Sequence, residues 1–180
     1  VSQTVTPRNL LREKMIEYLD INIDRDENIV IIADSLNLDI KNKLTNIFPN
    51  SIKIKPEFEG YVLPELLDSL LVDSLPNKVI VESEIFTLVS SIVSQLNSQI
   101  TPERDVRLYT TYKGNQYDDP SIDIKNLGDL RFTYPSISKK IRSDSVTDFK
   151  ENYKDLFGSL PNSDVVRGYD ITKDIVLRIL

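Results

Sequence analysis

The chain of 180 residues contains no cysteine, no histidine and no tryptophan. Without cysteine it forms neither a disulfide nor a thiolate zinc site, and this absence agrees with an oxidising compartment without requiring one. Without histidine it lacks the commonest general base and the commonest transition-metal ligand. No pairing of a nucleophile with a base is evident among the remaining residues. The sequence therefore predicts a protein that is not an enzyme.

Glycine and positive charge are also scarce. The five glycines form neither G-x-G-x-x-G nor G-x-x-x-x-G-K, the loops that hold phosphates, so we predict no nucleotide and no other cofactor. Lysine and arginine number 22 against 28 acidic residues, and the net charge is −6. Nucleic acid is excluded as a partner, because no basic cluster faces the phosphates. Apolar runs stay far below the roughly 20 residues of a transmembrane helix, so we predict no membrane span.

A run of strand length, residues 28–35, organises the first half of the chain. It is rich in β-branched residues and ends at a carboxylate and a hydroxyl, which is typical of a strand buried on both faces of a parallel sheet. Similar runs predict three further strands, at 51–54, 78–82 and 105–109. Apolar residues at helical spacing predict helices in the three connections, at 36–48, 63–71 and 84–97. This alternation predicts an α/β fold with an open, mainly parallel sheet and helices on both faces.

The pattern is different at the two ends of the chain. Before the first strand, Thr6 and Pro7 predict the start of a helix. Beyond Gly114 the regular spacing is lost, and alternating residues predict one short strand at 130–135. Two amphipathic helices follow, the first ended by Gly158 and the second capped by Ser163.

Polar residues gather where the predicted strands end. Ligands of open α/β sheets bind beyond the carboxyl ends of the strands, so these residues are candidates for the wall of a binding cleft. They are Asp34, Ser35, Glu57, Glu82, Ser83, Tyr112 and Lys113. The alternative is structural, because Asp34, Glu82 and Ser83 also suit the caps of the helices that follow them.

Two other kinds of chemistry receive little support. Asp34 ends a strand as a phospho-accepting aspartate does, and Lys113 follows a late strand, but no acidic pair precedes Asp34 in a strand. Asp118, Asp119 and Asp123 form an acidic loop without the glycine and terminal glutamate of a calcium-binding EF-hand. A solvated loop is the better interpretation, and we predict no metal site.

The second half of the chain carries a family resemblance. Residues 149–153, 157–158, 160–162 and 166–171 resemble a recurring segment of type I periplasmic binding proteins, in which an F-x-x-x-Y/F helix leads through a proline turn to a helix with a G-Y-D signature. Residues 107–134 are similar to that family's passage between its two lobes. The nearest branch is that of amino-acid transporter substrate-binding proteins, some of which carry lysin-motif domains for peptidoglycan.

The resemblance implies a domain organisation. Residues 1–117 would form the βα sheet lobe, the second lobe of the family, whose strands begin at residue 28. Residues 118–180 would hold the crossover and helices returning toward a first lobe. Because the last residues, 177–180, are apolar and lack a helix-ending signal, we expect a fragment of a longer protein. Tyr169 and Asp170 match the family signature, and helix packing is their favoured role.

The resemblance also implies a function and a location. It predicts a non-catalytic ligand-binding module of a solute-binding-like protein in the periplasm or cell envelope, with a small solute such as an amino acid. The alternative is an envelope scaffold that binds peptidoglycan or another protein without a small ligand. An enzyme of flavodoxin-like architecture is a third hypothesis, which the absence of a phosphate loop disfavours.

Overall fold

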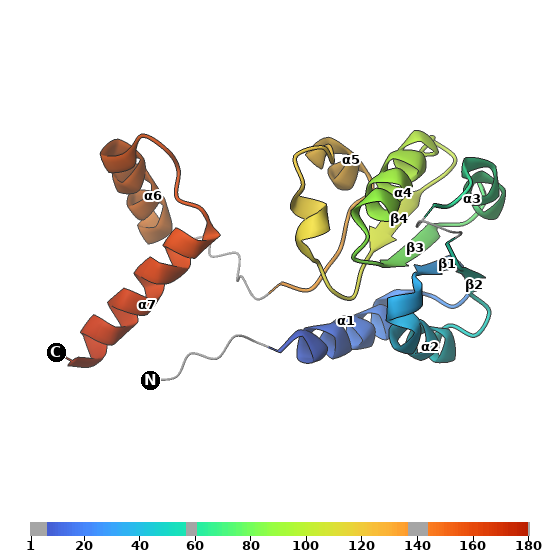
Figure 1. Ribbon diagram of the computed structural model, residues 1–180, viewed down its shortest axis with the longest axis horizontal. Coiled ribbons are helices and arrows are strands. Elements are labelled where there is room, and N and C mark those ends of the chain that lie inside the picture. Colours follow the sequence, from blue (N-terminus) through green and yellow to red (C-terminus); the bar gives the residue numbers. More distant parts are fainter. Residues whose placement is uncertain (1–6, 57–60, 137–143, 180) are drawn as a thin grey trace. The chain divides into compact units, whose positions relative to one another are not determined.

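The computed structural model describes residues 7–56, 61–136 and 144–179 (Figure 1). The chain separates into two compact units, 1–137 and 138–180. Glu57, one of the residues expected at the site, lies outside the described residues, as does Thr6. Among the described residues, no helix is both long and apolar enough to cross a membrane.

The first unit is built on an open, parallel sheet of four strands in the order β2-β1-β3-β4, which confirms the predicted fold class. The strands are β1 (Asn28–Ala33), β2 (Ile52–Ile54), β3 (Asn77–Glu82) and β4 (Val106–Tyr109). In the register, Val30 lies opposite Ile52 on one side and opposite Val79 on the other. The chain passes from β1 to β2 on one side and places β3 on the other, so the strand order reverses between β1 and β3.

Helices cover both faces of this sheet (Figure 1). One face carries α1 (Arg8–Asn22) and α2 (Leu38–Ile47), and the other carries α3 (Pro64–Leu70), α4 (Phe86–Ser98), the 3-10 turn η2 (Asn115–Asp118) and α5 (Ile124–Asp129). Because side chains alternate along a strand, β1 sends Ile29 and Ile31 to the first face and Val30 and Ile32 to the second. Each fully buried aliphatic side chain contributes about 2 kcal/mol to folding.

Three local predictions were wrong, each for a physical reason. The strand expected at 130–135 is a single bridge between Tyr109 and Thr133, because Arg131 has a φ of 47° that interrupts the extended backbone. The apolar face of the helix expected at 36–48 does not include Leu36. That residue lies in the 3-10 turn η1 (Ser35–Asn37) before the helix and is 85% exposed. Ser163 was expected to cap the last helix, but α7 (Ser163–Ile179) begins at that residue, so the residue before it is the cap: the Asn162 side chain accepts the hydrogen bond from the Val165 amide.

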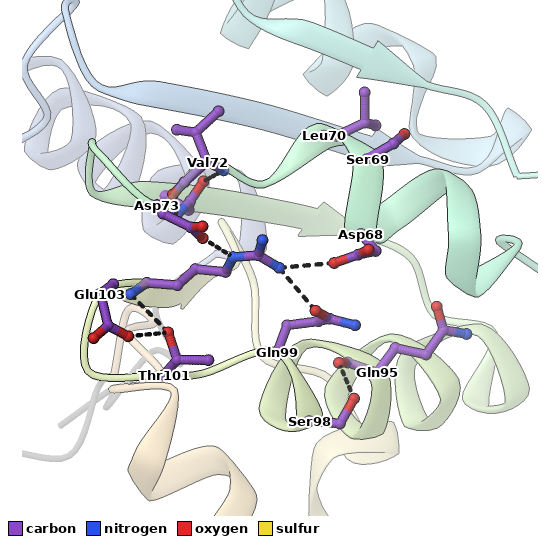
Figure 2. A network of polar contacts seen from close by, with 12 residues as sticks. Asp68, Ser69, Leu70, Val72, Asp73, Gln95, Ser98, Gln99, Thr101 and Glu103 are labelled. Carbon is purple, nitrogen blue, oxygen red and sulfur yellow. Dashed lines mark hydrogen bonds and ion pairs between the residues drawn. The ribbon is translucent and has the colours of Figure 1, made fainter.

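The amino-terminal edge of the sheet is closed by polar contacts. Asn77 is fully buried at the start of β3, and its side chain bonds to Asn28, to Leu75, to the carbonyl of Asp105 and twice to the Val72 backbone. Figure 2 shows a second network at this edge, in which one arginine joins two connections of the fold. Arg104 pairs there with Asp68 and Asp73 and donates to Gln99.

The second unit is a pair of helices, α6 (Asp144–Phe157) and α7 (Ser163–Ile179). Gly158 ends α6 with a φ of 72°, a left-handed conformation that favours glycine. Phe149 stacks on Tyr169 with ring centroids 4.1 Å apart, so Tyr169 takes part in helix packing. Leu156 and Phe157 remain exposed.

Candidate functional site

The carboxyl-terminal ends of β1 and β3 bring Asp34 and Ser83 together. The Asp34 amide donates to the carbonyl of Glu82 at 3.2 Å, and the Ser83 hydroxyl donates to Asp34 Oδ2 at 2.6 Å. Both side chains are buried. Because the strand order reverses between these two strands, the pair lies at the position where open α/β sheets bind ligands.

Asp34 and Ser83 also cap the turns that follow them. Asp34 Oδ1 accepts hydrogen bonds from the Leu36 amide and from Asn37 Nδ2, both at 2.9 Å. Ser83 Oγ accepts from the Ile85 amide at 3.0 Å. The capping alternative therefore describes what these two residues do in this structure. The neighbouring Ser35 is exposed.

Glu82 has a different role, because its side chain caps no helix. It is 1% exposed, and its two oxygens accept hydrogen bonds from the amide and the hydroxyl of Thr111, at 2.5 and 2.8 Å. Arg12 Nη2 lies 3.8 Å from Glu82 Oε2. Burial raises the pKa of Glu82 to about 7, against the opposing effects of the Thr111 hydrogen bonds and of the Arg12 charge.

Arg12 extends the network from α1 to the turn after β1. Its Nη2 donates to Asn37 Oδ1 at 2.9 Å, and Asn37 in turn contacts Asp34. Its buried Nε has no hydrogen-bond partner among the described residues. Burial lowers the pKa of Arg12, and the nearby Glu82 carboxylate opposes that effect. The polar groups at the ends of β1 and β3 thus join the start of α1 in one connected network.

Tyr112 and Lys113 lie at the same edge, after β4. The Arg8 guanidinium lies over the Tyr112 ring, 4.4 Å from its centroid, and also pairs with Glu84. Lys113 pairs with Asp118, and its Nζ lies 5.1 Å from the centroid of the Tyr134 ring. Cation–π contacts of this kind contribute about 0.5–1 kcal/mol at exposed positions.

Two open clefts flank the first turns of α1. One offers about 500 Å³ and is lined by Arg8, Glu84, Phe86, Tyr112, Gly114, Asn115, Gln116 and Asp119. The other offers about 480 Å³ and has Arg12, Asn37, Asn9 and Lys43 in its wall. Each cleft combines cationic, acidic and amide side chains. Such walls suit a small polar ligand that carries charge.

The first and the last described residues of this unit lie at the same edge of the sheet. α1 begins at Arg8, beside Glu84 and Tyr112, which follow β3 and β4. On the far side, Thr133 pairs in parallel with Tyr109, so residues 133–136 run in the direction of the strands. The start of α1 and residues 133–136 therefore both lie at the edge that carries the candidate site.

The described residues contain no group of three acidic side chains placed to hold a metal ion. In the acidic loop, Asp119 accepts from the Ser121 amide and Asp123 from the Lys125 amide. The Ser121 hydrogen bonds lower the pKa of Asp119. These carboxylates stabilise local turns, as expected for a solvated loop.

Comparison with protein-family models, curated proteins and solved structures gave no match. Function is therefore inferred from the geometry of the site. Sequence reasoning had placed Asp34, Glu82, Ser83, Tyr112 and Lys113 at this edge, where the structure has them.

Sequence reasoning missed Arg8, Arg12, Asn37 and Thr111. One signal for the arginines was available, since they lie one helical turn apart at the start of a helix that precedes a parallel strand. Such a helix begins at the carboxyl-terminal edge of the sheet.

Proposed function

We propose that the sheet unit is a non-catalytic module that binds a small, charged solute at the carboxyl-terminal edge of its sheet, within a solute-binding-like protein of the cell envelope. The observation that carries this proposal is the network from Ser83 through Asp34, Asn37 and Arg12 to Glu82 at the reversal of strand order.

The chemistry of the edge favours a zwitterion such as an amino acid. Arg8 offers a planar guanidinium for a carboxylate, and Glu84 offers a carboxylate for an ammonium group. Their side chains are 39% and 52% exposed, so a ligand reaches both. Phe86 and Tyr112 supply apolar surface in the same cleft. A ligand with both charges replaces the Arg8–Glu84 pair with two pairs of its own.

Hydrolytic chemistry has no support at this edge. The Ser83 hydroxyl is buried, donates to Asp34 Oδ2 and accepts from the Ile85 amide, so these contacts hold it in a cap and away from a substrate. Glu82 is enclosed, and its oxygens are engaged by Thr111. These contacts favour binding over catalysis.

A thermal-shift screen with the common L-amino acids tests the proposal. Binding to the folded state raises the melting temperature in proportion to the logarithm of ligand concentration, once the ligand exceeds its dissociation constant. We expect such a rise in the wild type and its loss in Arg8→Gln. Arg25→Gln is the matched control, because Arg25 also forms a single surface ion pair, with Asp20, but at the opposite edge. A shift of equal size in both variants contradicts the assigned site.

A peptidoglycan or protein scaffold is the second candidate. Its support is apolar exposure at this edge, where Leu36 and Ile85 are 85% and 37% exposed on the turns after β1 and β3. Exposed apolar side chains at one edge offer contact surface to a macromolecule. Co-sedimentation with purified peptidoglycan tests it, with Leu36→Ser expected to weaken the binding. Absence of co-sedimentation in the wild type contradicts a peptidoglycan scaffold.

A further inference from the structure

Arg12 and Glu82 are an incompletely matched pair. The closest approach of Arg12 Nη2 to the carboxyl group is 3.8 Å, beyond hydrogen-bonding distance, and Nη2 donates to Asn37 instead. The adjacent Nε is buried without a partner among the described residues. A buried carboxylate is costly unless its charge is paired at close range. Arg12 therefore stabilises the charge of Glu82 only partly and keeps a donor for another acceptor.

The hydrogen bonds of Glu82 to Thr111 are compatible with its neutral form as well as with its charged form. Oε2 contacts the Thr111 hydroxyl, which acts as donor or acceptor by rotating its hydrogen. A proton on Oε2 therefore donates to Thr111 Oγ1, while Oε1 keeps the Thr111 amide. The two hydrogen bonds to Thr111 therefore survive protonation, and only the Thr111 hydroxyl hydrogen has to rotate.

The other charged and titratable groups near Glu82 are held apart from it by their own contacts. Asp34, at the end of β1, has its oxygens occupied by Ser83, Asn37 and the Leu36 amide. Arg8 and Glu84 pair with each other, and their charges affect the pKa of Arg12. Tyr117, on η2, is buried, which raises the pKa of its hydroxyl far above the ordinary value and keeps it neutral. Arg12 is thus the nearest charge able to change the ionisation of Glu82.

We propose that an anion binds Arg12 in the second of the two clefts beside α1 and that Glu82 takes up one proton from solvent as it does so. This inference goes beyond the proposed function, because this cleft shares no lining residue with the cleft between Arg8 and Glu84. Arg12 lines the cleft that also contains Asn9, Asn37 and Lys43, and its side chain is 13% exposed although its Nε is buried. A carboxylate bound at the exposed part of the guanidinium shares the positive charge with Glu82 and adds a negative charge nearby. Both effects favour the neutral form of Glu82.

The direction of the pH dependence follows from linkage. Without ligand the pKa of Glu82 is about 7, and the bound anion raises it further. At pH values between the pKa of Glu82 in the free protein and its pKa in the complex, the complex holds one more proton than the free protein. The dissociation constant for an anion therefore rises about tenfold per pH unit from pH 7 upward. Below about pH 6 it stays constant, because Glu82 is already neutral in the free protein.

Acetate serves as the probe, with its dissociation constant followed by NMR chemical shifts between pH 5.5 and 8. In the wild type we expect binding to weaken by up to about tenfold per unit above pH 7. Glu82→Gln keeps a neutral side chain of the same shape, so its acetate affinity should not change with pH. Arg12→Gln should lose the binding. Glu103→Gln is the control, because Glu103 is exposed at the opposite edge, and it should behave as the wild type does.

The outcomes separate this inference from the proposed function. Acetate binding in the wild type with no dependence on pH overturns proton uptake and leaves the binding site standing. Absence of acetate binding in the wild type at every pH overturns the inference, while the amino-acid screen decides the proposed function by itself. The wild-type pH series is decisive without any variant, so poor folding of Glu82→Gln does not prevent a result. Retention of wild-type affinity in Arg12→Gln assigns the anion to another residue and overturns the proposal.

Discussion

The burial of Glu82 predicts a specific change in stability with pH. In an unfolded chain this carboxyl group has a pKa near 4.5, and in the folded protein the pKa is about 7. The difference corresponds to about 3 kcal/mol of free energy, because each pKa unit equals about 1.4 kcal/mol. The folded state thus binds the proton more tightly than the unfolded state does. Stability is therefore lost as the pH rises from about 4.5 to 7 and does not change through Glu82 above that range.

Glu82→Gln isolates this effect, because glutamine keeps a carbonyl for the Thr111 amide and an amide for its hydroxyl. All other titrating groups are common to both proteins, so they cancel in the difference between the two free energies of unfolding. We expect this difference to move in favour of the variant by about 2–3 kcal/mol between pH 5 and pH 8.

Urea unfolding followed by far-UV circular dichroism at four pH values in this range measures the difference. Glu103→Gln, at an exposed position, should track the wild type at each pH. A shift of even one pKa unit would change the difference between the two free energies of unfolding by about 1.4 kcal/mol. If the difference changes by less than about 0.5 kcal/mol over this range, Glu82 titrates as an exposed carboxyl group does. That result would refute both the burial argument and the proton site built on it.

Three further changes test the fold by urea unfolding or helicity. Asn77→Leu should lower the free energy of unfolding by about 3 kcal/mol or more, because it leaves the Val72 backbone and the Asn28 side chain without these hydrogen bonds. A decrease of less than about 1 kcal/mol contradicts this reasoning. Arg104→Gln should cost less than about 1 kcal/mol per ion pair, since its carboxylate partners are more than half exposed, and high salt should reduce the effect. Gly158→Ala should destabilise the second unit by about 1 kcal/mol because of its positive φ, seen as lower helicity on heating; unchanged melting contradicts the strain.

The sheet could be predicted from the sequence because its signal is local. Residues 29–33 and 79–81 are continuous apolar runs in which most residues are β-branched, and a strand buried on both faces needs that composition. The short turn η1 and helix α5 were missed, because their few residues carry little periodicity. The bridge at Thr133 was overestimated as a strand because alternation does not reveal the left-handed backbone at Arg131.

The polar network could be predicted only in part. Asp34 and Ser83 follow two strands, and the rule for parallel sheets places such residues at one edge. The partners of Glu82 depend on packing instead, since Arg12 and Thr111 lie 70 and 29 positions away along the chain. Nothing local in the sequence marks a glutamate at the end of a strand as buried, so the raised pKa of Glu82 became evident only with the fold.

The two edges of the sheet use buried polar groups in opposite ways. At the amino-terminal edge, Asn77 satisfies both ends of its amide with hydrogen bonds inside the protein, as folding alone requires. At the carboxyl-terminal edge, Arg12 keeps a buried donor without a described partner, and Glu82 lies too far from it for a hydrogen bond. An unpaired buried donor adds no stability to the fold, whereas a binding site for a charged ligand needs a donor that the protein itself leaves unpaired. The same contrast explains why variants at Asn77 should affect stability alone, while variants at Arg12 should affect binding.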